Sequence, residues 1–146
     1  MQHVSQPINY VFYWSRCRNR AYDVTDIDIM RSSIRNNAAS NITGFLHREA
    51  EFYIQYFEGP EGAVNQLRDT LLTDTRHFNF QLLDTGRTPT RIFSEWSMGY
   101  SNERKSQIGL SERKITPNHL DPLALLDFLL VTARDQVGAR KVLIAK

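Results

Sequence analysis

The chain has 146 residues, of which 41% are hydrophobic and 11% aromatic, and its formal net charge is +2. This length suits one domain with a short C-terminal extension, and the apolar content is enough for a packed core, which excludes a disordered chain. The basic cluster at Arg16, Arg18 and Arg20 is interpreted as a solvated loop, so no direct nucleic-acid partner is expected, and no run approaches the ~20 apolar residues of a membrane span.

The first predicted strand covers residues 8–15, after an N-terminus that lacks the basic start and apolar stretch of a signal peptide. Aromatic or β-branched residues lie on both of its faces, where Val11 and Tyr13 alternate with Tyr10, Phe12 and Trp14. A strand of this kind is expected at the centre of a sheet that is covered on both sides.

A helix is predicted over residues 25–37. Its first turn holds acidic residues, which are favourable near a helix N-terminus, namely Asp26 and Asp28. Ile27, Met30 and Ile34 follow at helical spacing, and Asn37 continues this stripe, which we expect to face the core. A buried side-chain amide costs about 1–3 kcal/mol unless it is hydrogen bonded, so Asn37 indicates a polar site.

Two strands are predicted at residues 41–47 and 51–58, joined by a polar turn at residues 48–50. The second strand is apolar on both faces, yet Gln55 lies in its middle. The charged residues 47–51 are expected to affect an edge of the sheet. Gly59 and Pro60 end the strand, and the next helix is predicted to end near residues 73–74 and to bury Val64, Leu67 and Leu71.

Strands predicted at residues 78–88 and 93–100 complete a β-α-β-β-α-β-β order. This order predicts an α+β, ferredoxin-like sheet, in which we expect the first and third strands to lie side by side and parallel. Tyr13 and Gln55 are then neighbours. We expect a domain over residues 1–100 and a C-terminal helical extension over residues 101–146.

The extension contains a polar stretch and a final helix that opens at Asp121-Pro122. This helix is expected to pack on the far face of the sheet, against the side that carries Trp14. Its apolar residues at 123–131 can serve an interface as well as a core, and we expect a homo-oligomer.

Ordinary enzyme motifs are absent from the sequence. It has no Gly-rich phosphate loop, no H-E-x-x-H and no C-x-x-C, and its four histidines lack metal-ligand spacing, so no metal site is expected. The lone Cys17 excludes an internal disulfide and fits a reducing cytoplasm, the expected location. The remaining feature is a phenol and amide network of Tyr13, Asn37 and Gln55, which can bind a planar heterocycle with donors and acceptors along its edge.

Six segments, in order, resemble the BLUF domain, a sensor of blue light using FAD. They are FYWS at 12–15, SSIRNN at 32–37, NITGFL at 41–46, IQYFEG at 54–59, DTRHFN at 74–79 and RIFSEWSMGY at 91–100. The resemblance runs from about Asn9 to Tyr100, and the C-terminal part is similar to that of short stand-alone members with no fused output domain. Trp14 is bulkier than is usual in the family and is expected to point away from the flavin.

The resemblance implies a noncovalent flavin, FAD with FMN or riboflavin as alternatives, held between the two helices on one face of the sheet. It places Tyr13 beside the isoalloxazine ring, Gln55 between that phenol and the flavin N5/O4 edge, and Asn37 at the carbonyl and imide edge. The other implied cofactor-binding residues are Asn36 close to Asn37, Ile29 and Leu71 on the ring faces, Ser33, and Asp74, Arg76 and His77 near the ring and the ribityl-phosphate tail.

The implied activity is that of a blue-light photoreceptor, not an enzyme. Tyr13 would give an electron and a proton to the photoexcited flavin and take them back, leaving Gln55 rotated or tautomerised with a new bond to the flavin carbonyl. An amide has a donor at one end and an acceptor at the other, so its reversal rewires both neighbours. Trp96 and Met98 on the last strand, and then the C-terminal helix, would pass the signal to an unidentified partner protein.

Two alternatives are open from the sequence. One is a small flavin-dependent oxidoreductase, which would need an open substrate pocket beside the flavin and a site for a reductant. The other is an interaction module without chromophore. Colour of the purified protein separates the module from the other two, and a reversible spectral change without substrate separates the photoreceptor from the oxidoreductase.

Overall fold

The computed structural model describes residues 7–19, 24–103 and 108–145, without the side chains of residues 103 and 137–145. The N-terminal residues 1–4, Arg20 and the polar segment at 104–107 lie outside the described residues. In the part that is described, no helix is long and apolar enough to cross a membrane.

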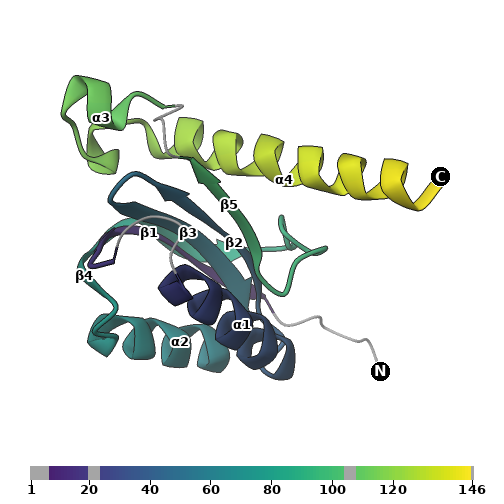
Figure 1. Ribbon diagram of the computed structural model, residues 1–146. Coiled ribbons are helices and arrows are strands. Elements are labelled where there is room, and N and C mark those ends of the chain that lie inside the picture. Colours follow the sequence, from purple (N-terminus) through teal and green to yellow (C-terminus); the bar gives the residue numbers. More distant parts are fainter. Residues whose placement is uncertain (1–6, 20–23, 104–107, 146) are drawn as a thin grey trace.

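Five strands form one sheet in the order β4-β1-β3-β2-β5. The strands are β1 (Ile8–Cys17), β2 (Thr43–Glu49), β3 (Phe52–Gly59), β4 (His77–Thr88) and β5 (Gly99–Glu103). Helices α1 (Val24–Ala39) and α2 (Glu61–Thr73) lie on one face of the sheet, and α4 (Pro122–Ala145) crosses the other face (Figure 1). The short α3 (Leu110–Arg113) and the 3-10 turn η1 (Pro117–His119) connect β5 to α4.

The prediction that the first and third strands are parallel is wrong. β1 and β3 are adjacent but antiparallel, with Tyr13 opposite Gln55. The connection through α1 makes β2 run in the direction of β1, and the tight β2–β3 hairpin then reverses β3. Because cross-strand partners share a face in either orientation, Tyr13 and Gln55 are still neighbours.

The last strand of the sheet begins later than predicted. β5 covers Gly99–Glu103, parallel to β2, whereas residues 93–98 are irregular. Their backbone groups are used elsewhere: Ile92 and Phe93 donate their N–H groups to the Glu58 carboxylate, and the Trp96 carbonyl accepts from Gly44. A segment whose hydrogen bonds are used in this way cannot form a ladder.

The charged end of the β2 segment is also different from the prediction. Arg48 and Glu49 belong to β2 and are buried, so the turn is limited to Ala50 and Glu51. β2 is not an edge strand, because β5 covers it. The Arg48 guanidinium is paired with Asp26 of α1 at 2.9 Å, and this ion pair offsets the cost of burying the charge of Arg48.

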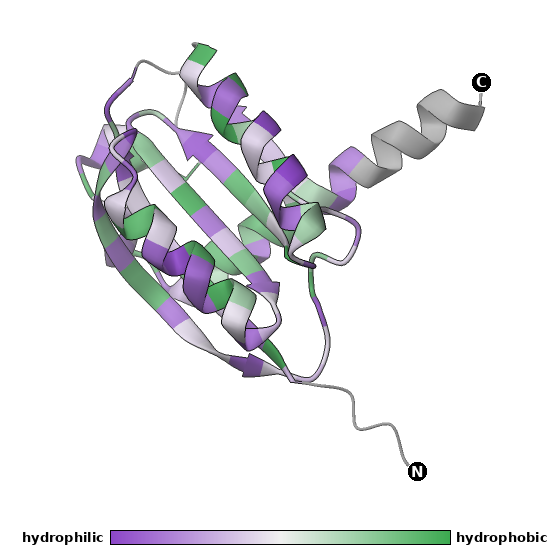
Figure 2. Cartoon of the chain, turned by 90° about the horizontal axis from the view of Figure 1, so that it is seen from below, coloured by the Kyte–Doolittle hydropathy of each residue, from purple (hydrophilic) through white to green (hydrophobic). Residues whose placement is uncertain are grey.

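The sheet has an apolar core on each of its faces. On the α4 side, the sheet residues Phe12, Trp14 and Ile54 pack with Leu125 and Leu129, as predicted for the final helix and for Trp14. On the other side, the core is formed with α1 and α2 and includes Val11, Tyr13, Leu46, Phe57 and Val64, with Leu67 and Leu71 packed against it. Figure 2, seen from the α1 and α2 side, shows these two helices next to each other across the strands.

The buried face of α1 is rotated relative to the predicted stripe. Ile27 and Ile34 are about half exposed, whereas Asp26 and Asn37 are buried. Ile29 and Met30 pack against the core on this side of the sheet. The cause is the ion pair of Asp26 with Arg48, which turns the acidic residue inward and the two isoleucines outward.

Candidate functional site

A pocket lies between α1, α2 and the sheet. Nine of the ten residues predicted to bind a cofactor line it, namely Tyr13, Ile29, Ser33, Asn37, Gln55, Leu71, Asp74, Arg76 and His77. The tenth, Asn36, lines a neighbouring hollow between α1 and α2.

The centre of the pocket floor is a hydrogen-bonded pair from adjacent strands. The Tyr13 hydroxyl donates to Gln55 Oε1, and Gln55 Nε2 lies 3.5 Å from Met98 Sδ, which accepts. Tyr13 and Gln55 are both buried. Burial, with a smaller effect of the Asp74 charge, raises the pKa of the Tyr13 phenol, so it is neutral at physiological pH.

The Tyr13 ring is held by its neighbours. It stacks on Phe80 of β4 with ring centroids 4.3 Å apart and meets the edge of Phe57 at 6.3 Å. These contacts fix the direction of the hydroxyl toward Gln55, since a buried aromatic ring wedged between two others has few alternative positions.

Asn37 reaches the pocket from the last turns of α1. It is 3% exposed, and its Nδ2 donates to the carbonyl oxygen of Ser97 at 3.1 Å. The amide therefore ties α1 to the irregular segment that carries Trp96 and Met98.

Trp96 and Met98 lie on opposite sides of the sheet, in the segment before β5 and not on the strand as predicted. Met98 is buried in the core on the α1 and α2 side, next to Gln55. The Trp96 ring meets Phe45 edge-on at 6.2 Å and packs with the core on the α4 side. Met98 is thus in direct contact with the Gln55 amide of the phenol and amide pair.

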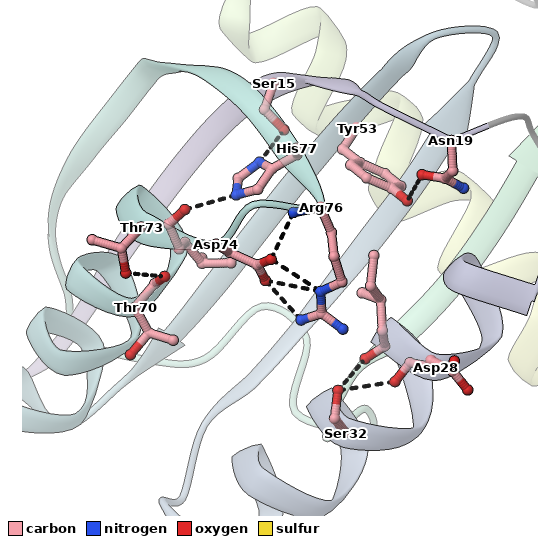
Figure 3. Close-up of polar contacts among 12 residues, drawn as sticks. Ser15, Asn19, Asp28, Ser32, Tyr53, Thr70, Thr73, Asp74, Arg76 and His77 are labelled. Carbon is pink, nitrogen blue, oxygen red and sulfur yellow. Dashed lines mark hydrogen bonds and ion pairs between the residues drawn. The ribbon is translucent and has the colours of Figure 1, made fainter.

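The mouth of the pocket carries two opposite charges, which compensate each other. Arg76 and Asp74 form a forked ion pair, with Nη2 to Oδ2 at 2.7 Å and Nε to Oδ1 at 3.0 Å. The hydrogen bond from Arg76 holds the pKa of the Asp74 carboxyl below its usual range. The guanidinium points toward the α1 turn that carries Asp28 and Ser32 (Figure 3).

His77 connects the mouth to the floor. Its Nε2 lies 2.7 Å from the Leu71 carbonyl oxygen, and its Nδ1 lies 2.7 Å from Ser15 Oγ (Figure 3). Because a carbonyl only accepts, Nε2 carries the proton. The ring therefore fastens the end of α2 to β1.

The family comparison decides which family the chain belongs to. Residues 8–99 match the family BLUF, described as sensors of blue-light using FAD. The chain belongs to the BLUF family. The predicted resemblance is thereby confirmed, as are the sensor class, in place of an enzyme, and FAD as the family's chromophore.

Solved BLUF structures have the same fold. The structure described as the BlsA ground state has a TM-score of 0.72 and 25% identity, over 85% of this chain and 88% of that one. The dark-state structure of BlrB, a BLUF protein, has a TM-score of 0.61 and 32% identity, over 68% of this chain and 75% of that one. The α+β, ferredoxin-like prediction is confirmed by these similarities.

Other relatives are larger proteins. The photoactivated adenylate cyclase subunit beta of Euglena gracilis is 33% identical over 76 residues, which are 51% of this chain and only 9% of that protein. A bacterial light-regulated adenylyl cyclase has a TM-score of 0.64 and 26% identity, over 91% of this chain and 36% of that one.

The lining of the pocket combines apolar walls with a polar edge. Ile29 of α1 and Leu71 of α2 supply apolar walls from the two helices, and the amides of Asn37 and Gln55 supply the polar edge. A planar heterocycle needs this combination of two apolar faces and one edge of donors and acceptors. Among the described residues, no group of three or more His, Cys, Asp or Glu side chains could hold a metal ion.

Three lining residues of the BLUF pocket were missed by the sequence reasoning, namely Leu46, Leu67 and Tyr53. Tyr53 could have been found, because it lies two residues before Gln55 on the same strand and therefore on the same face. Its polar partners, Asp26 and Arg48, could not have been found from the sequence, since no short sequence pattern joins α1 to β2.

Proposed function

We propose that this chain is a blue-light photoreceptor whose photochemical centre is Tyr13 and Gln55, beside a noncovalently bound flavin. The observation that carries the proposal is the buried chain Tyr13–Gln55–Met98 on the floor of a pocket with apolar walls. FAD is the expected flavin, with FMN or riboflavin as alternatives. Residues 1–100 would be the flavin-binding domain and residues 101–146 its extension.

The residues that would hold the flavin surround the pocket. Ile29 and Leu71 would contact the ring faces, and Asn37 would bond the carbonyl and imide edge. Ser33 and, from the neighbouring hollow, Asn36 would support that edge. Arg76, with Asp74 and His77, would lie near the ribityl tail, where Arg76 can meet a phosphate through two parallel N–H bonds.

A bound flavin supplies absorption of blue light and an excited state that accepts an electron. Tyr13, neutral in the dark, would give that electron together with its phenolic proton and then take both back. Gln55 would be left with its amide rotated or tautomerised. Burial keeps water from competing for the hydrogen bonds during this cycle.

Rotation of Gln55 has a specific consequence for Met98. In the structure, the Gln55 amide nitrogen faces the Met98 sulfur, which only accepts. After a rotation, the carbonyl oxygen would face that sulfur, and neither atom can donate. Met98 then loses its hydrogen bond and is the group that must move.

Movement of Met98 would reach the surface through β5 and α4. Met98 directly precedes β5, and Gln136 of α4 donates to the Tyr100 carbonyl oxygen at 2.7 Å. We infer that a partner protein reads the position of these two elements. A cytoplasmic location and a homo-oligomer stay predictions, the second supported by exposed Leu123 and Val131 on α4.

The deciding experiment is the visible spectrum of the purified protein before and after blue light and during dark recovery. We expect a flavin spectrum that shifts slightly to the red and recovers. Tyr13→Phe should abolish the shift while flavin is retained. Tyr56→Phe is the matched control, because Tyr56 is buried on the opposite face of β3, and it should leave the shift intact.

Two results would overturn the photoreceptor proposal. A colourless protein would indicate an interaction module without chromophore. A flavin that only bleaches to its reduced form in light, with no red shift, would favour the small flavin-dependent oxidoreductase.

A further inference from the structure

A second phenol lies in the flavin pocket, and the mechanism above does not use it. Tyr53 lines the pocket on the same face of β3 as Gln55. Its hydroxyl donates to Oδ1 of Asp26 at 2.5 Å. Asp26 is only 3% exposed, so the pocket contains a phenol bonded to a buried carboxylate.

The Asp26 carboxylate is held as an anion by its surroundings. Arg48 Nη1 donates to Oδ1 at 2.9 Å, and the Tyr100 hydroxyl donates to Oδ2 at 3.2 Å. Asn19 Nδ2 donates to Oδ1 at 3.0 Å. A buried charge with a guanidinium and three further donors is stable as the ion, so Asp26 is a base in a fixed position.

Arg48 is itself fixed. Its Nη2 donates to the carbonyl oxygen of Asn19 at 2.8 Å and its Nε to that of Ala50 at 2.9 Å. Burial, together with the bond to Asp26, raises the pKa of the Tyr53 phenol, which therefore keeps its proton in the dark. The pair is a neutral phenol facing a carboxylate, not a phenolate.

The two phenols of the pocket thus differ in their proton acceptors. Tyr13 is bonded to an amide oxygen, whereas Tyr53 is bonded to a carboxylate. A phenol becomes a strong acid when it loses an electron, and a carboxylate is a far better base than an amide. The indole rings of Trp14 and Trp96 pack on the α4 side, so Tyr13 and Tyr53 are the aromatic donors among the described residues that line the pocket.

We propose that Tyr53 is a second photochemical electron donor, with Asp26 as its proton acceptor. This inference rests on the proposed function. One electron passes from Tyr53 to the photoexcited flavin, the phenolic O–H bond breaks, and an O–H bond forms at Asp26 Oδ1. On recombination, the electron and the proton both return to Tyr53, and no atom is gained or lost.

This second cycle does not pass through Gln55. It returns the pocket to its dark hydrogen-bond pattern and gives no red shift. Tyr53 therefore competes with Tyr13 for the excited state and lowers the yield of the signalling state.

The test is the excited-state lifetime of the flavin-loaded protein, measured by time-resolved fluorescence. In Tyr13→Phe the lifetime should still be short, because Tyr53 still quenches the excited state of the flavin. Adding Tyr53→Phe should lengthen it several-fold. Adding Tyr56→Phe instead, on the opposite face of the same strand, should leave it unchanged. In the otherwise native chain, Tyr53→Phe should raise the yield of the red-shifted state.

The role of Asp26 has a separate readout. In the Tyr13→Phe background, quenching should be slower in D₂O than in H₂O, because a proton moves with the electron. The isotope effect should vanish in Asp26→Asn/Arg48→Gln, which removes both buried charges together and avoids an unpaired guanidinium. A lifetime in Tyr13→Phe that does not respond to Tyr53→Phe would overturn the inference.

The outcomes distinguish failure of this inference from failure of the proposed function. If the native protein binds flavin and shifts to the red, but Tyr53→Phe does not change the excited-state lifetime, the photoreceptor proposal stands and the role of Tyr53 as a donor is wrong. If the native protein binds no flavin, both proposals are wrong.

Discussion

At the scale of single residues, Arg48 and Asp26 form an ion pair at 2.9 Å in which both side chains are buried. Arg48→Gln would leave the Asp26 carboxylate buried without its cation. We expect a loss of about 3–5 kcal/mol in the free energy of unfolding, because an uncompensated buried charge is expensive. Urea denaturation followed by circular dichroism measures this loss.

The control for Arg48 is a pair on the surface. Arg16 and Glu51 are 3.1 Å apart but both partly exposed, so Arg16→Gln should cost only about 0–1 kcal/mol. Removal of both buried charges in Asp26→Leu/Arg48→Leu should recover most of the stability lost in Arg48→Gln. Equal losses in the two single variants would contradict the argument.

At the scale of elements, α4 is attached to the sheet by a few leucines. Leu129 is fully buried against the β-sheet core, and Leu129→Ala should cost about 2–5 kcal/mol, because it removes contacts and leaves a cavity. The flavin absorption maximum should not change, since α4 and the pocket lie on opposite faces of the sheet. Denaturation and the visible spectrum test these two statements together.

Leu123 on the same helix provides the comparison. It is 73% exposed, so Leu123→Ala should change the unfolding free energy little. A large loss for Leu123→Ala that depends on protein concentration would instead place this face of α4 in a homo-oligomer interface.

At the scale of the whole molecule, buried tyrosines should set the alkaline limit of stability. Burial raises the pKa of Tyr13, Tyr53 and Tyr56, and it raises the pKa of Tyr100 to about 12. Their unfolded pKa is about 10. Because the pKa values are raised in the folded state, the contribution of these tyrosines to the free energy of unfolding is fully present below the unfolded pKa. It is lost as the pH rises through the folded-state pKa values.

We therefore expect the free energy of unfolding to fall as the pH increases above about 10. Phenolate absorbance should then appear together with the loss of near-ultraviolet circular dichroism. Tyr56→Phe should make the fall less steep, because one tyrosine no longer titrates. Ionisation of these tyrosines well before unfolding would contradict their burial.

Much of the architecture followed from the sequence by local rules. Alternation of aromatic and β-branched residues predicted a central β1 and β3, and both strands are covered on their two faces. Asn37 was predicted to face inward because it continues a helical stripe, and Gln55 because it lies in the middle of an apolar strand, and both amides are buried. The ordered family segments added the resemblance to the BLUF family, which the family comparison confirmed.

The tertiary structure alone decided features that depend on partners far apart in the chain. Pairing with Arg48 turned Asp26 inward and exposed Ile27 and Ile34, which helical spacing had placed in the core. The Glu58 carboxylate occupied the backbone donors of Ile92 and Phe93 and delayed the start of β5.

The sequence by itself determined most of the strands and helices, because periodicity and composition act over a few neighbours, and it predicted polar residues that line the pocket. Only the tertiary structure decided that β1 and β3 are antiparallel, that Trp96 and Met98 occupy opposite sides of the sheet, and that Tyr53 meets Asp26. Each of these depends on side chains or strands brought together across many residues, where a hydrogen bond or an ion pair can outweigh a local preference.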